Sequence, residues 1–126
     1  MTFVDTNVFM YAVGRPHPLR REAQRFFESA LRRRTPLATS AEVLQEFLHA
    51  YLPTGRLQTL EAAWILAESL TTVWPVDADD VRHARDLIAR HPGLGARDLL
   101  HLACCQRRKV DELMTFDRGL ADAWSR

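Results

Sequence analysis

Two aspartates directly follow segments that have the character of β-strands. Asp5 comes after Thr2-Phe3-Val4, and Asp117 comes after Met114-Thr115-Phe116. In open α/β sheets, ligands bind beyond the carboxyl ends of the strands, so both carboxylates occupy positions suited to binding chemistry. An aspartate after a strand is also a favoured helix N-cap, and either residue could have that structural role instead. Capping explains Asp5 less well, because the two polar residues that follow it could cap the helix without it.

Two further acids occupy helical positions that border the expected core. On the helix expected over residues 40–52, Glu46 lies at the margin of the apolar side, whereas Glu42 lies further round toward solvent. Asp98 opens a helix that is apolar almost all round, which predicts burial. An acid at the edge of a core needs a partner, and a cation is one candidate. The alternatives are that Glu46 reaches water past its neighbours and that Asp98 interacts with the helix dipole.

These four acids become informative together if the fold brings them to one place. Carboxylates that repel one another are neutralised by hard divalent cations such as Mg²⁺, which prefer oxygen ligands. One or two such ions can orient a water, lower its pKa and clamp a scissile phosphate during in-line attack. Such a site needs acids and space, and no nucleophilic serine or cysteine. His101, one turn after Asp98, is interpreted as a hydrogen-bonded buried histidine and not as a ligand.

The elements that must position these acids alternate along the chain. Strands are expected at residues 2–5, 36–39, 72–76 and 112–116. Helices are expected at residues 7–13, 19–33, 40–52, 57–70, 77–91, 97–108 and 117–124. A capping-box pattern, Thr39-Ser40-Ala41-Glu42, starts the third helix, and Asp77 caps the fifth. This alternation predicts an α/β fold, a three-layer α/β/α sandwich with a central parallel sheet of four or five strands.

Composition places the chain among globular proteins. Its 126 residues, 47% hydrophobic and 26% charged, predict a single domain over residues 1–126. No apolar run approaches the roughly 18 residues that span a bilayer, and no secretory signal is apparent, so a cytoplasmic protein without membrane attachment is expected. Cys104 and Cys105 are neighbours on an expected helix and are interpreted as reduced, buried thiols.

The net charge of +1 does not by itself indicate a nucleic-acid partner. However, 16 of the 17 basic residues are arginine, which forms bidentate contacts with phosphate more readily than lysine does. The alternative is that the arginine clusters are solvated helix faces and ends. The charge pattern therefore permits RNA binding without demonstrating it.

Four sequence blocks, taken in order, resemble the motifs of PIN-domain nucleases. The blocks are Asp5-Thr6-Asn7-Val8-Phe9, Thr39-Ser40-Ala41-Glu42-Val43-Leu44-Gln45-Glu46-Phe47, Arg97-Asp98-Leu99-Leu100-His101-Leu102-Ala103 and Thr115-Phe116-Asp117. Within that family, the short chain and the first motif at the N-terminus resemble the VapC toxins. The ordered set covers nearly the whole chain, so it is much more specific than any one block.

The resemblance implies a fold, an activity and partners. It implies a PIN fold, dependence on Mg²⁺ or Mn²⁺, and endoribonuclease activity on structured RNA such as tRNA, rRNA or mRNA. It also implies a homodimer held inactive by an antitoxin protein whose C-terminal segment wraps the toxin. Carried over by position, the acids at the metal site would be Asp5, Glu46, Asp98 and Asp117.

The resemblance also suggests which residues support those acids. Thr6 or Asn7 would support Asp5, and the Thr115 hydroxyl would lie close to Asp117. Glu42 and Glu46 lie one helical turn apart and both could face the groove. The motif position, like the helix geometry, favours Glu46.

Apolar residues on the helix expected at 57–70 offer a surface for the dimer. They supply more apolar area than a domain of this size would readily cover, and exposed patches of this kind usually mark an interface. An ordinary core face is the competing interpretation. The residues are Leu57, Leu60, Trp64, Leu66 and Leu70.

Two other function classes compete with the nuclease. A haloacid-dehalogenase-type phosphatase also places an aspartate after its first strand, but it needs a second acid two residues later, where this chain has Asn7. Such a phosphatase also needs a lysine in its active site, and Lys109 is the only lysine in this sequence. The non-enzymatic alternative is an α/β adaptor that binds a partner through its helices and uses the acids as caps. Metal binding at the four acids would separate that adaptor from the nuclease.

Overall fold

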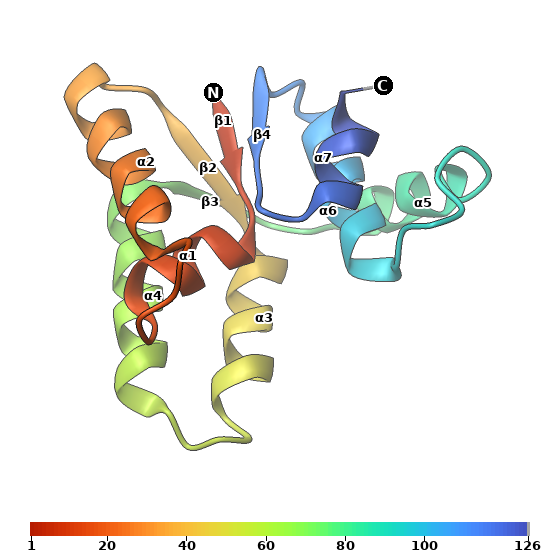
Figure 1. The fold of residues 1–126 in the computed structure, drawn as a ribbon. Helices are drawn as coiled ribbons and strands as arrows, with labels where there is room; N and C mark the ends of the chain where they lie inside the picture. Colours follow the sequence, from red (N-terminus) through yellow and green to blue (C-terminus); the bar gives the residue numbers. More distant parts are fainter. Residues whose placement is uncertain (126) are drawn as a thin grey trace.

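The computed structural model describes residues 1–125, and within them four strands form one parallel sheet in the order β3-β2-β1-β4 (Figure 1). The strands are β1 (Thr2–Val4), β2 (Leu37–Ser40), β3 (Thr72–Trp74) and β4 (Glu112–Met114). β1 is central and pairs with both β2 and β4. All four strands occur where the sequence predicts them, and the predicted parallel sheet is confirmed.

Seven helices within the described residues cover the two faces of this sheet (Figure 1). They are α1 (Thr6–Val13), α2 (Arg20–Arg33), α3 (Ala41–Tyr51), α4 (Leu57–Leu70), α5 (Ala78–Asp86), α6 (Ala96–Arg107) and α7 (Arg118–Trp124). Helices α1 to α4 lie on one side and α5 to α7 on the other, which confirms the predicted three-layer sandwich.

Two hydrophobic clusters hold the layers together. The first contains residues of β1 and of the first four helices, among them Phe3, Phe9 and Phe47. The second joins α5, α6 and α7 through residues such as Leu102 and Leu120. Helices α1 and α3 pack in the first cluster and most buried residues of α6 pack in the second, so the sheet between them determines where residues of these helices can meet.

Several smaller predictions can be compared with the structure. Cys104 and Cys105 are buried and free, as predicted. No helix within residues 1–125 combines the length and the apolar character needed to cross a membrane. The fifth helix is shorter than expected, because regular α-helix ends at Asp86 and turns follow up to the residue before His91.

The predicted capping box at the start of α3 is wrong. Thr39 is fully buried within β2, where its hydroxyl donates a hydrogen bond to the carbonyl oxygen of Val4 at 2.9 Å. Ser40 is the N-cap of α3, but its side chain makes no capping hydrogen bond. The sheet contact therefore prevails over the local pattern. A complete capping box occurs instead at α5, between Asp77 and Asp80.

A charged network joins α5 to the C-terminal end of α6. Asp80 is fully buried and accepts hydrogen bonds from Arg107 Nη1 at 2.6 Å and from Arg108 Nη1 at 2.7 Å. The guanidinium of Arg108 also lies over the Trp74 ring of β3. Burial would raise the pKa of Asp80, but hydrogen bonds from Arg108, from the backbone of Asp77 and from Arg107 hold it well below its usual range. The network fixes the C-terminal end of α6, whose first turn carries Asp98.

This network predicts a measurable loss of stability on neutralising Asp80. Asp80→Asn should lower the free energy of unfolding at pH 7 by about 2 kcal/mol, since hydrogen bonds between charged groups are lost. Because the pKa of Asp80 is lowered by folding, its contribution is complete above the unfolded-state pKa of about 4 and is lost as the pH falls below it. Urea unfolding followed by circular dichroism at pH 7 and pH 3 measures both effects.

The neighbouring Asp79 provides the matched control. It is exposed and pairs with Arg82 on the surface of α5, and within the described chain its only link to the network is a contact of 4.0 Å with Arg107. Exposed pairs of this kind contribute little, so Asp79→Asn should change the free energy of unfolding by less than about 1 kcal/mol. Equal losses for the two variants would contradict the structural role assigned to Asp80.

Candidate active site

All four predicted acids line one open pocket at the carboxyl edge of the sheet. The pocket is lined by Asp5, Thr6, Asn7, Met10, Glu46, Arg97, Asp98 and Asp117. The carboxylates come from the end of β1, from α3, from the first turn of α6 and from the end of β4. Glu42 is not among the lining residues, so the structure distinguishes it from Glu46. Met10 and Arg97 were not singled out in the sequence, because neither carries a motif signal of its own.

Asp5 combines a capping role with its place in the pocket. It is 4% exposed and is the N-cap of α1. One carboxylate oxygen accepts a hydrogen bond from the backbone N–H of Thr6 at 2.7 Å, and the other accepts from the Thr115 hydroxyl at 2.7 Å. Burial raises the pKa of Asp5, although His101 and these two hydrogen bonds act in the opposite direction. Capping and a functional role are therefore not exclusive at this position.

Thr115 connects three of the predicted residues. Its hydroxyl donates to Asp5 and accepts hydrogen bonds from the backbone N–H of Asp117 at 3.0 Å and from Asn7 Nδ2 at 3.4 Å. The side-chain oxygen of Asn7 in turn accepts from the backbone N–H of Phe116 at 3.2 Å. These bonds tie the start of α1 to the segment after β4. Asn7 thus reaches Asp5 through Thr115, and Thr115 lies beside Asp117 as the resemblance implied.

Glu46 is held by two donors from different elements. It accepts hydrogen bonds from the Thr6 hydroxyl and from His101 Nε2, the latter at 3.1 Å. His101 Nε2 also lies 3.5 Å from a carboxylate oxygen of Asp5. The side chain of Thr6 therefore supports Glu46, while only its backbone supports Asp5.

His101 is the residue whose position the sequence did not reveal. It is 1% exposed and hydrogen-bonded, as interpreted, but its partners are two of the four acids. One donor atom each from Asp5, Glu46 and His101 lie within 4.8 Å of one another, a spacing that could hold a metal ion. Its Nδ1 has no hydrogen-bond partner within the described chain. The available signal was its spacing of three residues from Asp98 on one helix, which places both on neighbouring positions of that helix.

Charge in this pocket is poorly compensated. Burial raises the pKa of Asp98, and the negative charges of Asp117 and Asp5 raise it further. Burial lowers the pKa of His101, but its hydrogen bond to Glu46 and the nearby carboxylates outweigh this and raise it. Among residues 1–125, the ion pairs made by these acids involve His101 and no lysine or arginine. A divalent cation, which prefers oxygen ligands, fits this donor set.

Capping alone does not account for the arrangement. Asp117 is the N-cap of α7 and accepts a hydrogen bond from the backbone N–H of Leu120 at 3.1 Å. Glu46 lies in the middle of α3, where no helix end needs a cap, and Gly95 rather than Asp98 is the N-cap of α6. Two of the four acids therefore have no capping role that would bring them to the pocket.

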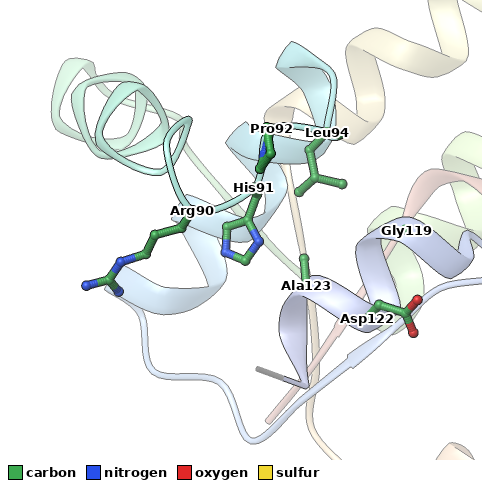
Figure 2. A pocket seen from close by; sticks show the side chains of 8 residues that line it. Arg90, His91, Pro92, Leu94, Gly119, Asp122 and Ala123 are labelled. Carbon is green, nitrogen blue, oxygen red and sulfur yellow. The ribbon is translucent and has the colours of Figure 1, made fainter.

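Another pocket lies between the segment before α6 and α7 (Figure 2). It is lined by Arg90, His91, Pro92, Gly93, Leu94, Gly119, Asp122 and Ala123. Figure 2 shows the Arg90 side chain extending away from Asp122, so its two charged groups do not converge. None of the four predicted acids lines this pocket, and it offers no comparable donor set.

Comparison with known proteins identifies a matching family and relatives that cover nearly the whole chain. The PIN domain family matches residues 2–123. Ribonuclease VapC23 of Mycobacterium tuberculosis is 62% identical over 124 residues, which are 98% of this chain and 98% of that protein. Ribonuclease VapC13 of the same species is 42% identical over 120 residues, 94% of this chain and 92% of that protein.

Solved structures show the same fold at lower identity. The structure of Mycobacterium tuberculosis VapC20, described as a sarcin-ricin loop cleaving toxin, has a TM-score of 0.83 and 21% identity, covering 98% of this chain and 95% of that one. A toxin–antitoxin complex from Klebsiella pneumoniae has a TM-score of 0.68 and 20% identity, covering 96% and 91%. The family match and the two relatives together lead to one conclusion: this chain belongs to the PIN-domain family and, within it, to the VapC ribonuclease toxins.

Proposed function

We propose that this chain is a divalent-metal-dependent endoribonuclease, a single PIN domain that acts in the cytoplasm as the toxin of a toxin–antitoxin pair. The observation that carries the proposal is the convergence of four carboxylates in one pocket without a lysine or arginine partner. The ribonuclease names of the relatives at 62% and 42% identity support RNA as the substrate. Structured RNA such as tRNA, rRNA or mRNA stays the predicted target class.

In this proposal Asp5, Glu46, Asp98 and Asp117 hold Mg²⁺ or Mn²⁺. When bound, the ion lowers the pKa of a coordinated water and stabilises negative charge on the scissile phosphate. The protein's own contribution is orientation. The Thr115 hydroxyl fixes Asp5, and the donors Thr6 and His101 fix Glu46, so these two carboxylates are oriented before an ion binds.

Arg97 is the positively charged residue in the lining of the pocket. It is exposed, next to Asp98 at the start of α6. An RNA phosphate that enters the pocket is repelled by the acids, and a guanidinium at the rim offsets part of that repulsion through a bidentate contact. We therefore assign Arg97 to positioning of the phosphate.

Metal binding should depend on Asp5 without the fold depending on it. Asp5→Asn should weaken Mn²⁺ binding at least about tenfold in isothermal titration calorimetry, because a charged ligand is lost. In the absence of metal its melting temperature should stay close to the parent's, because asparagine still accepts the Thr6 hydrogen bond and the removal of one repulsive charge offsets the loss of the bond from Thr115. A metal-free variant that melts far below the parent would identify Asp5 as structural. Glu42→Gln, one helical turn from Glu46, should leave Mn²⁺ affinity unchanged.

RNA cleavage should require both the metal and the acids. Purified parent protein incubated with total RNA should produce internal cuts with Mg²⁺ and none with EDTA, as mapped by sequencing of the cut ends. Asp5→Asn, Glu46→Gln and Asp98→Asn should each reduce the cleavage rate at least about 100-fold, or about 2.7 kcal/mol of transition-state stabilisation. Glu42→Gln should retain the parent's rate. Cleavage that survives EDTA would contradict the metal mechanism, and absence of all cleavage would favour the adaptor interpretation.

An antitoxin would have to block this pocket. The pocket is acidic at its floor, so a suitable inhibitor would place an arginine or lysine among the carboxylates and apolar residues on the neighbouring helices. The fold shared with a chain of a toxin–antitoxin complex supports such a partner. Most of that interface would be apolar and would lie away from the acids.

Expression in a bacterial host tests the toxin role. The unmutated chain alone should arrest growth and cut host RNA, and a small co-encoded protein should restore growth. Asp5→Ala should remove the toxicity but still co-purify with that partner, since most of the interface lies elsewhere. Harmless high-level expression of the unmutated chain in cells with intact RNA would contradict the toxin assignment.

The homodimer stays a prediction, and the structure narrows the surface available to it. Of the five apolar residues predicted on α4, all but Leu57 are partly buried against the core. The core-face interpretation therefore holds for Leu60, Trp64, Leu66 and Leu70. Leu57 is 58% exposed and Ile65 is 54% exposed, so a dimer through α4 would have to bury these two residues.

A further inference from the structure

A second open pocket adjoins the acidic one and has a different chemistry. It is lined by residues of α1, of the loop after α1, and of the turn between α3 and α4, including Tyr11, Arg15, His17 and Arg56. Met10 lines both pockets, so the two share a wall. The second pocket contains no carboxylate. It is therefore a basic and aromatic extension of the acidic site.

Three aromatic rings form a column toward this pocket. Phe116, which directly precedes Asp117, packs edge-on against Tyr11 with ring centroids 5.6 Å apart. Tyr11 stacks on His17 at 4.4 Å with an interplanar angle of 26°. His17 is exposed, so the column begins beside the acids and ends at a ring in contact with solvent. Exposed rings of this kind are platforms on which nucleobases stack.

The His17 ring is held in place before any ligand arrives. Its Nδ1 accepts a hydrogen bond from the backbone N–H of Leu19 at 3.1 Å, just before α2 begins. The chain can turn sharply after α1 because residue 14 is glycine, and a Cβ there would lie 2.7 Å from the carbonyl oxygen of Met10. The turn and the hydrogen bond together bring His17 back over Tyr11. A rigid platform loses less conformational entropy on binding than a flexible one.

The arginines of this pocket are available to an anion. Arg56 lies over the Tyr51 ring at 5.5 Å and is 3.5 Å from the Thr59 hydroxyl. Within residues 1–125, neither Arg15 nor Arg56 forms an ion pair with a carboxylate. By contrast, Arg107 and Arg108 both form ion pairs with Asp80. The planar guanidinium groups of Arg15 and Arg56 can therefore contact phosphates.

We propose that this pocket is a subsite for the single-stranded RNA segment next to the scissile phosphate, with a base stacked on His17 and phosphates at Arg15 and Arg56. The proposal rests on the ribonuclease function proposed above and names how that site holds its substrate. The acids alone would repel the RNA backbone, whereas the adjoining pocket supplies both attraction and a stacking surface. Unpaired bases, unlike those in a helix, expose the faces that such stacking needs.

RNA binding without cleavage tests the stacking platform. The probe is a 5′-fluorescein-labelled single-stranded RNA 12-mer of mixed sequence, titrated with the full chain in EDTA and followed by fluorescence anisotropy. His17→Asn keeps an acceptor for the Leu19 N–H but removes the ring, so it should raise Kd at least about fivefold. His17→Phe keeps a ring and loses the acceptor, so it should bind within about twofold of the parent. This pair separates stacking from a structural role of His17.

Salt dependence tests the arginines. Arg15→Gln and Arg56→Gln should each reduce the slope of log Kd against log salt concentration by about 0.7, the value for one phosphate contact with a single strand. Arg90→Gln removes the same charge at the remote pocket of Figure 2 and should leave Kd and slope unchanged. With Mg²⁺ present, His17→Asn should also lower kcat/KM for cleavage of the same RNA about as much as it weakens binding.

The outcomes distinguish this proposal from the one on which it rests. Metal-dependent cleavage with unchanged Kd in the His17, Arg15 and Arg56 variants would overturn the subsite and leave the nuclease intact. If those variants instead lost binding to a co-expressed protein partner while RNA binding stayed the same, the pocket would be a protein-docking surface, which also overturns the proposal. RNA binding that depends on the His17 ring, without any cleavage in Mg²⁺, would support the subsite and contradict the nuclease.

Discussion

Repulsion among carboxylates at one edge of the sheet is the constraint on which the rest of the site depends. Asp5 and Asp98 lie where burial and neighbouring negative charges both raise their pKa. The Thr115 hydroxyl holds Asp5 and the Thr6 hydroxyl holds Glu46. His101 contacts both of these acids, and no lysine or arginine within residues 1–125 pairs with them. These donors fix two of the four carboxylates in position, and His101 can balance at most one of the negative charges in the pocket. The pocket consequently keeps negative charge that a bound cation could balance.

A second buried aspartate in the same molecule is stabilised in a different way, by direct contact with arginine. Asp80 is as inaccessible as Asp5, yet Arg107 and Arg108 donate to it directly, and its pKa falls well below its usual range. Its charge is balanced within the protein, so the group is structural. Both arrangements involve α6, whose C-terminal end binds Asp80 while its first turn carries Asp98. An anchor at one end of a helix helps hold the other end against repulsion, which links the structural Asp80 to Asp98, the acid proposed to bind metal.

The parts of the site that could be predicted from sequence are those determined by one element at a time. Strand order along the chain identifies Asp5 and Asp117 as strand-end acids, and helical spacing separates Glu46 from Glu42. The contact between His101 and Glu46 depends on how α6 and α3 pack across β1, which no local pattern encodes. The same limit explains the failed capping box, since Thr39 bonds to the neighbouring strand. It also explains why most of the apolar residues of α4 are covered by the core.

The adjoining pockets divide two requirements that conflict on one surface and that Arg97 alone reconciles only in part. A site that binds a divalent cation must be acidic, yet an acidic surface repels the phosphates on either side of the bond to be cut. Placing Arg15, Arg56 and the His17 ring beside the acids, across the wall formed by Met10, separates attraction of the substrate from binding of the ion. Because Tyr11 of α1 stacks on His17 and Asp5 caps the same helix, α1 helps to set the distance between the His17 ring and the acids. Under the proposed function, that distance determines which phosphodiester bond meets the acids once a neighbouring base has stacked.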